Sequence, residues 1–378
     1  MFLKAVHLLI LLSRTTSLKA VHISDVPSLD YAPAAAISRC FSSSTPFPRG
    51  RMDVRSVKSV AANVRMAAAT MSRADNFVVI GHRGHGMNLL CSPDPRMRSF
   101  MENTILSFNS AANHPLDFIE FDVQVTRDDC PIIFHDDIIL SADNGKVYEK
   151  RVTELTSQEF LSYGMQREPG KVGKSLLRKT RDGKVVNWDV EKNDALCTLQ
   201  EAFQKVKPSL GFNIELKFDD CAAYQEEHLL RVLQTIMKVV SSYADRRPII
   251  FSSFHPDAAI LTRKLQRDYP VFFLTDGGTR IFRDTRRNSL EEAIKVCIGG
   301  GLQGIVSEVT AVYRNPGAVS KIKESNLSLL TYGNLNNDPE AVYAQHRMGI
   351  NGVIVDLVRE ITEAVAGLIK PPKDADSY

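Results

Sequence analysis

The stretch Asp117–Asp136, DFIEFDVQVTRDDCPIIFHD, determines how the rest of the chain is interpreted. It begins as a strand in which Phe118, Glu120 and Asp122 alternate with apolar residues, so the two acids share one face. Two ionised carboxylates in apolar surroundings are costly to bury unless a positive charge lies between them. A divalent cation would supply that charge, although an exposed strand edge or a salt-bridged pair would produce the same pattern.

A second apolar run at 131–134 ends at His135 and Asp136. His135 is a candidate general acid or base, because imidazole titrates near neutral pH. The link from Val125 to this run is too short for a crossover helix between parallel neighbours. The two runs are therefore either a sheet step without a helix or the arms of a local hairpin, and the sequence leaves both open.

Upstream, the apolar run at 77–80 is followed by GHRGHG at 81–86. This order places His82 and Arg83 at the carboxyl end of a buried strand. The glycines allow a sharp turn and a close approach to a ligand, although a plain turn has the same composition. The motif is not a dinucleotide-binding fingerprint, because no G-x-G-x-x-G opens a helix here.

Two further segments carry candidate site residues. In LGFNIELK at 210–217, Glu215 and Lys217 share the polar face of a strand. Asn103 is a good candidate for the N-cap of the helix that begins after it. Glu102 is either a further acidic site residue or only a neighbour of that helix start.

The second half of the chain alternates between helical and strand patterns, which predicts a parallel sheet. Nine candidate strands over roughly 300 residues favour a (β/α)8 TIM barrel. Strand carboxyl ends meet at one mouth of such a barrel, where active sites lie. The helices are expected at 225–241, 256–267, 289–298, 315–325 and 338–348, and strands at 248–252, 271–274, 304–307, 328–333 and 352–355.

The polar stretch from Ile138 to about Cys197 does not fit a barrel step. It is rich in Lys, Arg and Gly and contains the single tryptophan, Trp188. Long loops inside a compact domain are commonly functional. We therefore expect an insertion that caps the active-site mouth.

Composition excludes several classes of protein. The net charge of +3 is unevenly distributed, because the leader, residues 1–75, contains ten Lys or Arg, four Asp and no Glu. The remainder holds 37 basic and 40 acidic residues, so no basic surface suggests nucleic acid. The six cysteines (40, 91, 130, 197, 221 and 297) lack CxxC spacing, which favours a reducing compartment. No apolar stretch reaches the roughly 18 residues that a transmembrane helix needs.

The leader is rich in Ser, Ala and Arg, as in transit peptides of organelles, and is expected to be disordered. A secretory signal built on Lys4 and the short apolar run after it is the alternative. We expect one catalytic domain at 76–370, with the insertion at 138–197 and a tail at 371–378.

The ordered motifs HRG (82–84), ENT (102–104), EFDV (120–123), IIFHDD (132–137) and NIELK (213–217) resemble those of the glycerophosphodiester phosphodiesterases. These enzymes are grouped with the phosphatidylinositol-specific phospholipase C-like barrels. The resemblance runs from about Asn76 to Lys370 and is greatest to the plant plastid members. DTRRNSL at 284–290 and the strand ending in IVD at 354–356 are also similar to that group.

The resemblance implies hydrolysis of small glycerophosphodiesters to glycerol 3-phosphate and an alcohol, in phospholipid turnover and phosphate recycling. It implies a plastid location, with the secretory pathway or cytosol as alternatives, and it leaves the oligomeric state open. It also implies Mg²⁺ or Ca²⁺ bound by Glu120, Asp122 and Glu215, an acid/base pair of His82 and His135, and phosphate contacts from Arg83 and Lys217. Beside these residues, Glu102 is a candidate for a supporting role.

Other activities fit parts of the pattern. A lysophospholipase D-like enzyme would need an apolar entrance for an acyl chain, and the insertion is too polar to suggest one. A metal-dependent barrel lyase or aldolase also combines acids with histidine, but two histidines with an arginine suit phosphoryl transfer better. A non-catalytic binding barrel is disfavoured because every residue expected for catalysis is present.

Overall fold

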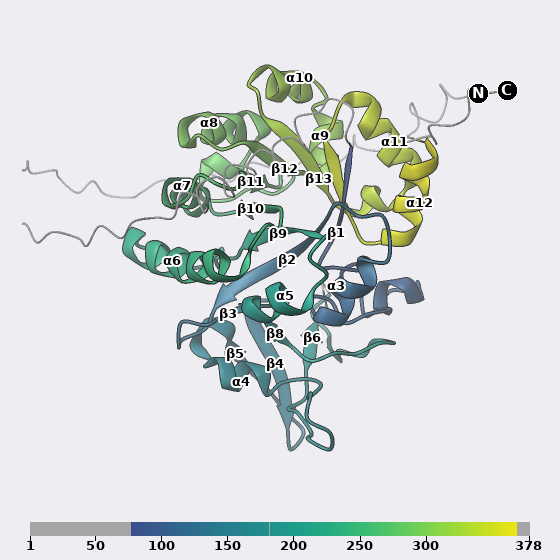
Figure 1. Cartoon of the computed structure of the whole chain (residues 1–378), viewed down its shortest axis with the longest axis vertical. Coiled ribbons are helices and arrows are strands. Elements are labelled where there is room, and N and C mark those ends of the chain that lie inside the picture. Colours follow the sequence, from purple (N-terminus) through teal and green to yellow (C-terminus); the bar gives the residue numbers. More distant parts are fainter. Residues whose placement is uncertain (1–76, 181, 369–378) are drawn as a thin grey trace, which may run out of the picture. The chain divides into compact units, whose positions relative to one another are not determined.

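The structure, a computed structural model, describes residues 77–180 and 182–368. Within them, eight parallel strands form a closed barrel (Figure 1), which confirms the predicted TIM barrel. Pairing of the first of these strands with both the second and the last closes the ring. The expected leader and tail lie outside the described residues. Around the ring the strands are β1 (Val78–Gly81), β2 (Phe118–Val125), β9 (Gly211–Leu216), β10 (Ile249–Ser253), β11 (Val271–Thr275), β12 (Gly304–Glu308), β13 (Ser328–Tyr332) and β14 (Gly352–Val355).

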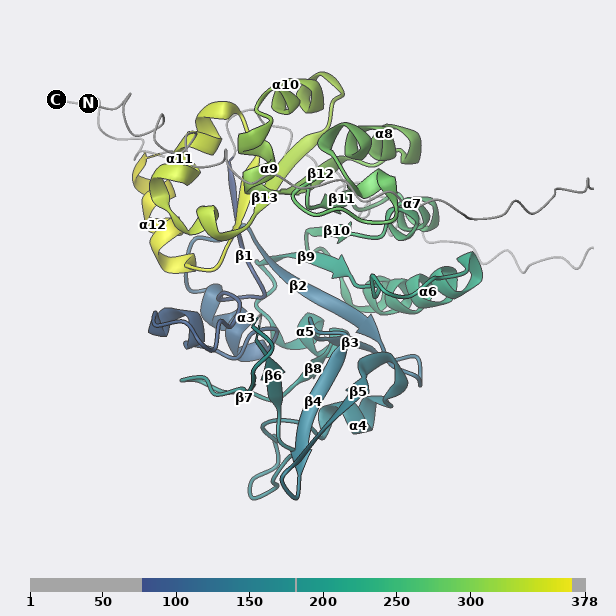
Figure 2. The same ribbon diagram turned by 180° about the vertical axis from the view of Figure 1, so that it is seen from behind.

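Helices cover the outside of the ring (Figures 1 and 2). Side-chain caps fix several helix starts: Thr198, for example, accepts from the backbone N–H of Glu201, whose carboxylate accepts from the N–H of Thr198. The helices are α3 (Ile105–Ala111), α5 (Leu199–Lys205), α6 (Glu226–Tyr243), α7 (Pro256–Leu265), α8 (Leu290–Gly300), α9 (Val309–Arg314), α10 (Gly317–Glu324), α11 (Pro339–Met348) and α12 (Val358–Leu368), with 3₁₀ turns at η1 (Pro95–Arg98), η2 (Val152–Glu154), η3 (Thr285–Arg287) and η4 (Asn334–Asn337).

Alternate residues of β2 face opposite sides of the barrel wall. Phe118 packs inside the ring with residues such as Ile80 and Leu330. Ile119 and Phe121 instead belong to the apolar layer that the strands share with α5 and α6. The acids two and four positions after Phe118 therefore point inward, as the alternation predicted.

The candidate strand at 131–134 lies outside the barrel and forms a hairpin with the end of β2. Strand β3 (Pro131–Ile133) runs antiparallel to the end of β2, with Val123 opposite Ile133. On its other side β3 pairs antiparallel with β8 (Cys197–Thr198). This settles the count of strands: the short link after Val125 is a hairpin turn, and the crossover to β9 comes later through α5.

The inserted segment is folded, which corrects the expectation of a polar loop region. It contains the strands β4 (Ile138–Asp143), β5 (Lys146–Arg151), β6 (Leu177–Lys179) and β7 (Val185–Asn187), in the sheet order β5-β4-β6-β7, and helix α4 (Ser157–Leu161). It also has an apolar core that includes Phe160, Tyr163 and Trp188. Its polar composition reflects exposed strand faces and turns, while a few large side chains supply the packing.

Five of the six cysteines lie in the described residues, and among these residues all five are free thiols. They are Cys91, Cys130, Cys197, Cys221 and Cys297. Within this part of the chain, no helix combines the length and apolarity that crossing a membrane requires.

Candidate active site

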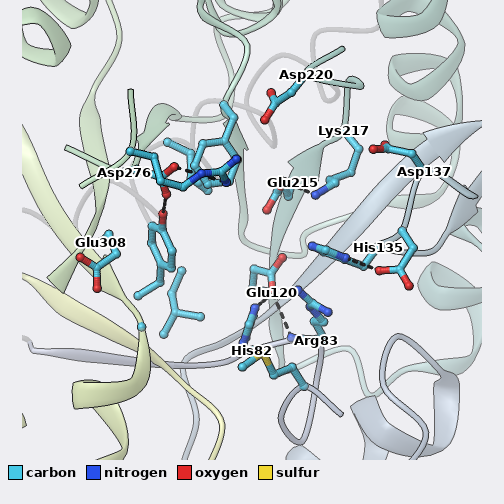
Figure 3. Close-up of a pocket in the computed structure, with 18 of the residues that line it drawn as sticks. His82, Arg83, Glu120, His135, Asp137, Glu215, Lys217, Asp220, Asp276 and Glu308 are labelled. Carbon is cyan, nitrogen blue, oxygen red and sulfur yellow. Dashed lines mark hydrogen bonds and ion pairs between the residues drawn. The ribbon is translucent and has the colours of Figure 1, made fainter. Parts of the chain in front are cut away.

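The carboxyl ends of the barrel strands surround a cavity of about 980 Å³ (Figure 3). Most of the predicted site residues line it, and they come from the loops and strands around β1, β2 and β9. Asp122 and Glu102 are buried beside them, at 1% and 2% exposure. The lining residues among those predicted are His82, Arg83, Glu120, His135, Glu215 and Lys217.

Three carboxylates meet at the base of this cavity. Asp122 of β2 lies opposite Glu215 of the neighbouring strand β9, and Glu120 precedes it on the same face. One oxygen from each of the three lies within 4.8 Å of the others. Burial, reinforced by the charge of Asp122, raises the pKa of Glu120 to about 8, and burial likewise raises the pKa of Glu215. The three acids therefore repel one another as they stand.

The residues of this cluster fit a divalent cation. Atom Oε1 of Glu120 is buried and has no hydrogen-bond partner. The possible ligands are all carboxylate oxygens, which hard cations such as Mg²⁺ and Ca²⁺ prefer. A cation between them would remove the repulsion that burial creates.

Two cations lie against the same acids. The Nζ atom of Lys217 is 3.1 Å from Glu215 and 3.5 Å from Asp122. The Nε atom of Arg83 is 3.5 Å from Asp122. Burial would raise the pKa of Asp122, but His135 and these two cations outweigh it and the pKa falls below its usual range. Arg83 and Lys217 thus concentrate positive charge beside the candidate metal site.

Glu102 fixes the side chain of Arg83. Its Oε1 atom accepts a hydrogen bond of 2.7 Å from Nη1 of Arg83. The backbone N–H of Arg83, whose φ is 50°, donates to Glu120 at 2.9 Å. Burial opposes ionisation of Glu102, yet Arg178 and Arg83 lower its pKa to about 2. Glu102 is therefore a buried, ionised carboxylate that binds the side chains of Arg83 and Arg178.

His82 is oriented by a carboxylate from the last barrel strand. Its Nδ1 atom lies 2.7 Å from Oδ1 of Asp356, which directly follows β14, and its Nε2 atom lies 3.9 Å from Glu120. Burial lowers the pKa of His82, but the charge of Asp356 and its hydrogen bond outweigh burial, so the pKa is raised. We did not predict from the sequence that Asp356 orients His82, although its position directly after the last barrel strand could have indicated a site residue.

His135 reaches the mouth by a different route from the one predicted. It does not end a parallel barrel strand, because β3 runs antiparallel to β2 and carries the chain back toward the mouth. The backbone N–H of Phe134 donates to the carbonyl of Asp122 at 3.0 Å, which holds the end of the hairpin there. Nδ1 of His135 donates to Asp136 at 2.7 Å. Burial, with Arg83 and Lys217 nearby, lowers the pKa of His135 well below its usual value.

Asn103 is a site residue and not the helix N-cap that we expected. The cap is Thr104, whose side chain accepts from the backbone N–H of Ser107. Asn103 has a φ of 57°, and its amide donates to Oδ2 of Asp122 at 2.9 Å. Asparagine tolerates this left-handed backbone better than most residues, which explains why it can occupy the turn.

The opposite side of the cavity has a different character. Phe254 and Tyr332 form an edge-to-face pair with ring centres 6.0 Å apart. The Tyr332 hydroxyl donates to Asp276, and Glu308 caps α9 nearby. Asp276 and Glu308 lie across the cavity from His135 and Lys217 (Figure 3). We call Phe254, Asp276, Glu308 and Tyr332 the recognition wall, and His82, Arg83, Glu120, Asp122, His135, Glu215 and Lys217 the reaction wall.

Comparison with known proteins agrees with this geometry. The model of the glycerophosphoryl diester phosphodiesterase family matches residues 82–360. The chain is 59% identical over 362 residues to the chloroplastic glycerophosphodiester phosphodiesterase GDPD1 of Arabidopsis thaliana, covering 95% of this chain and 92% of that one. It is 57% identical to GDPD2 of the same plant over 357 residues, or 94% and 89% of the two chains.

Solved structures share the fold at low sequence identity. One comes from Silicibacter pomeroyi, with a TM-score of 0.58, 19% identity and coverage of 79% of this chain and 98% of that chain. Another, from Oleispira antarctica, was solved in complex with the product sn-glycerol-3-phosphate, with a TM-score of 0.54, 18% identity and coverage of 76% and 96%.

Proposed function

The chain belongs to the glycerophosphoryl diester phosphodiesterase family and is a phosphoric diester hydrolase, and from this premise we propose that it is a metal-dependent enzyme for small glycerophosphodiesters. Glycerophosphocholine and glycerophosphoethanolamine would yield sn-glycerol 3-phosphate and the free alcohol. The observation that carries the proposal is the buried cluster of Glu120, Asp122 and Glu215 between two histidines and two cations.

Arg83 and Lys217 would bind the substrate phosphate. A phosphodiester carries one negative charge, and more charge develops as phosphorus is attacked. Arg83 offers a planar fork to two oxygens, whereas Lys217 offers a point charge. A metal ion bound by the three carboxylates would add further positive charge at the phosphate. These residues would neutralise the substrate without a large rearrangement, because their side chains are already held by carboxylates.

The two histidines differ in a way that supports separate roles. Asp356 keeps His82 protonated to higher pH, which suits a general acid. Burial and two nearby cations keep His135 neutral, which suits a general base. His135 would take the proton of the attacking hydroxyl, and His82 would give a proton to the oxygen of the leaving alcohol.

Two nucleophiles are compatible with this arrangement. If the substrate's own glycerol hydroxyl attacks, the alcohol leaves and a cyclic phosphate forms. Water then opens the ring, and the roles reverse: neutral His82 takes the proton of water and protonated His135 returns a proton to the glycerol oxygen. If water attacks directly, a single displacement gives the same products.

The recognition wall supports a substrate with a cationic headgroup. Aromatic faces bind ammonium groups by cation–π attraction, and Phe254 and Tyr332 border the cavity. Glu308 has no ion-pair partner in the described part of the chain, so its charge is available. The arginines on this side pair with carboxylates, Arg287 with Asp220 at 2.6 Å and Arg280 with Asp276 at 3.7 Å. The guanidinium carbon of Arg287 also lies 5.6 Å from the centre of the Phe254 ring.

An activity panel tests the proposal. Purified protein would be incubated with glycerophosphocholine, glycerophosphoethanolamine and lysophosphatidylcholine, each with Mg²⁺, with Ca²⁺ and with a chelator. We expect glycerol 3-phosphate from the first two substrates with at least one metal and none with the chelator. Faster cleavage of lysophosphatidylcholine would instead favour the lysophospholipase D-like alternative, and metal-independent cleavage would exclude the carboxylate assignment.

We also propose a plastid location, with a role in phospholipid turnover and phosphate recycling. The composition of residues 1–75 and the chloroplastic name of the GDPD1 relative support it. A fluorescent protein fused after residue 75 should enter plastids in plant cells. Accumulation in the secretory pathway or cytosol would contradict this location without affecting the proposed chemistry.

A further inference from the structure

Arg178 extends from β6 of the inserted sheet into the barrel mouth. Its side chain is only 13% exposed, and its guanidinium carbon lies 4.1 Å from the centre of the Trp188 ring. Its Nη1 atom donates to the carbonyl of Asn88 at 3.3 Å, and the indole N–H of Trp188 donates to the Asn88 side chain at 2.9 Å. A buried guanidinium needs several partners, and the inserted segment and the barrel supply them together.

Two carboxylates bind the ends of this guanidinium. Nη1 lies 3.0 Å from Oε2 of Glu102, and Nη2 donates to Oδ1 of Asp136 at 3.0 Å. The planar fork of an arginine can bridge two acids in one fixed geometry, whereas a lysine offers a single charged point. Arg178 therefore links Glu102 to Asp136, and the backbone N–H of Asn88 is a further donor to the same oxygen of Glu102.

Each of these acids in turn holds a group of the reaction wall. The other oxygen of Glu102, Oε1, accepts from Arg83 at 2.7 Å. The same oxygen of Asp136 that binds Arg178 also accepts from Nδ1 of His135 at 2.7 Å. That bond fixes the tautomer with the proton on Nδ1, which leaves Nε2 as the proton acceptor. Asp136 is 29% exposed; Gln124 donates to its backbone carbonyl at 3.0 Å, while Arg178 and His135 bind its side chain.

We propose that Arg178 is a positioning residue for the hydrolysis, acting through Glu102 on Arg83 and through Asp136 on His135. The assignment deepens the proposed function and rests on it. It means that the inserted segment completes the reaction wall by holding two of its groups, besides covering the mouth. A purely architectural arginine, which only ties the inserted segment to the barrel, is the alternative.

Steady-state kinetics separate these two roles. In Arg178→Met, kcat for glycerophosphocholine should fall by about 10–100-fold, the usual cost of losing a group that orients an active-site residue. Arg178→Lys should retain only slightly more kcat than Arg178→Met, because a lysine cannot bridge both acids. Arg167→Met is the matched control: Arg167 also comes from the inserted segment and pairs with a carboxylate, Glu201 of α5, away from the cavity. Normal kcat in Arg178→Met, or equal losses in Arg178→Met and Arg167→Met, would overturn the proposal.

A double-mutant cycle tests the route through Asp136. If Arg178 acts through this carboxylate, then Arg178→Met should have at least a threefold smaller effect in an Asp136→Asn background than in the wild type. Effects that multiply in full would show that Arg178 acts independently of Asp136 and would contradict this part of the proposal.

A measurement without substrate keeps the inference separate from the proposed function. Nitrogen-15 NMR of labelled histidine should show His135 in the Nδ1–H tautomer in the wild type and as a tautomer mixture in Arg178→Met. Arg167→Met should leave the wild-type signal. If the wild type cleaves no glycerophosphodiester, the proposed function fails and this spectrum alone decides the role of Arg178. An unchanged His135 signal in Arg178→Met would refute it.

Discussion

The reaction wall and the recognition wall border one cavity but are built differently. Each ionic group of the reaction wall contacts an oppositely charged group, as in the contacts of Arg83 with Glu102 and of Lys217 with Glu215. The recognition wall instead has an aromatic pair, a carboxylate held by a tyrosine hydroxyl and a glutamate at a helix start. In the function proposed above, the reaction wall would fix charges for one reaction, and the recognition wall would tolerate different headgroups because aromatic contacts are less directional. Substitutions in the two walls should therefore affect different kinetic constants.

The largest effect should come from loss of the metal site. A chelator should abolish activity, and Glu120→Gln, Asp122→Asn and Glu215→Gln should each weaken binding of Mg²⁺ or Ca²⁺ in calorimetric titration, since each replaces a carboxylate ligand with a neutral amide. Tyr332→Phe, in the recognition wall, should leave metal affinity unchanged. Unchanged affinity in all three carboxylate variants would remove the metal assignment.

The histidines come next. His82→Ala and His135→Ala should each lower kcat by roughly 10²–10⁴-fold, the usual contribution of a general acid or base. Because the two act as a unit, the double variant should lose much less than the product of the single effects. Phosphorus NMR would show whether a cyclic phosphate accumulates in His82→Ala, as expected if His82 activates the water. Near-normal turnover in either variant would exclude that histidine from the mechanism.

Asp356→Asn should have an intermediate effect, about 10–100-fold on kcat, because it removes the partner that orients His82. The carboxylate raises the pKa of His82, so its loss should lower that pKa. His82 would then lose its proton at lower pH, and the alkaline limb of the kcat/KM profile should move toward lower pH. A profile that keeps its shape would argue against His82 as the acid.

A smaller, substrate-dependent effect is expected in the recognition wall. Phe254→Leu should reduce kcat/KM for glycerophosphocholine by about 2- to 30-fold, corresponding to ~0.5–2 kcal/mol for a cation–π contact. A glycerophosphodiester with an uncharged headgroup, such as glycerophosphoglycerol, should be affected less. Equal losses for both substrates would mean that Phe254 supports the barrel and does not select the headgroup.

The smallest effect should follow removal of the leader. A chain starting near Ser72 should fold and retain full activity, because both walls are built from residues after Phe77. Thermal unfolding and kcat/KM would be compared with those of the full chain. Loss of cooperative unfolding would show that the leader belongs to the catalytic domain.

Local patterns were sufficient to predict the barrel and the core of the reaction wall. Alternation in β2 correctly placed Glu120 and Asp122 on one shared face, because side chains of alternate residues in a strand point to the same side. The hairpin that brings His135 to the mouth was one of two alternatives that the sequence left open, since the short link alone does not specify the pairing direction of β3.

Roles that depend on distant partners could not be predicted in this way. The bridge from Arg178 to Glu102 and Asp136 joins residues 76 and 42 positions apart, and nothing local to β6 indicates it. Asn103 likewise has a left-handed backbone and bonds to Asp122, 19 positions away, whereas the helix is capped by Thr104. The recognition wall was missed because Phe254 and Tyr332 look like ordinary strand-end aromatics until the ring closes.

The pairing of β3 with β8 also has an evolutionary consequence. Ile133 lies opposite Cys197, so the two ends of the inserted segment lie side by side at the edge of the barrel. Lengthening a loop whose ends are already joined costs little, about 0.6 kcal/mol for each doubling. We therefore expect homologous chains to differ more in the length between positions 138 and 196 than in the spacing of barrel strands, which an alignment of many homologues would measure. The contacts of Arg178 would limit this variation in length, because any replacement segment would need a cationic side chain that binds Glu102 and Asp136.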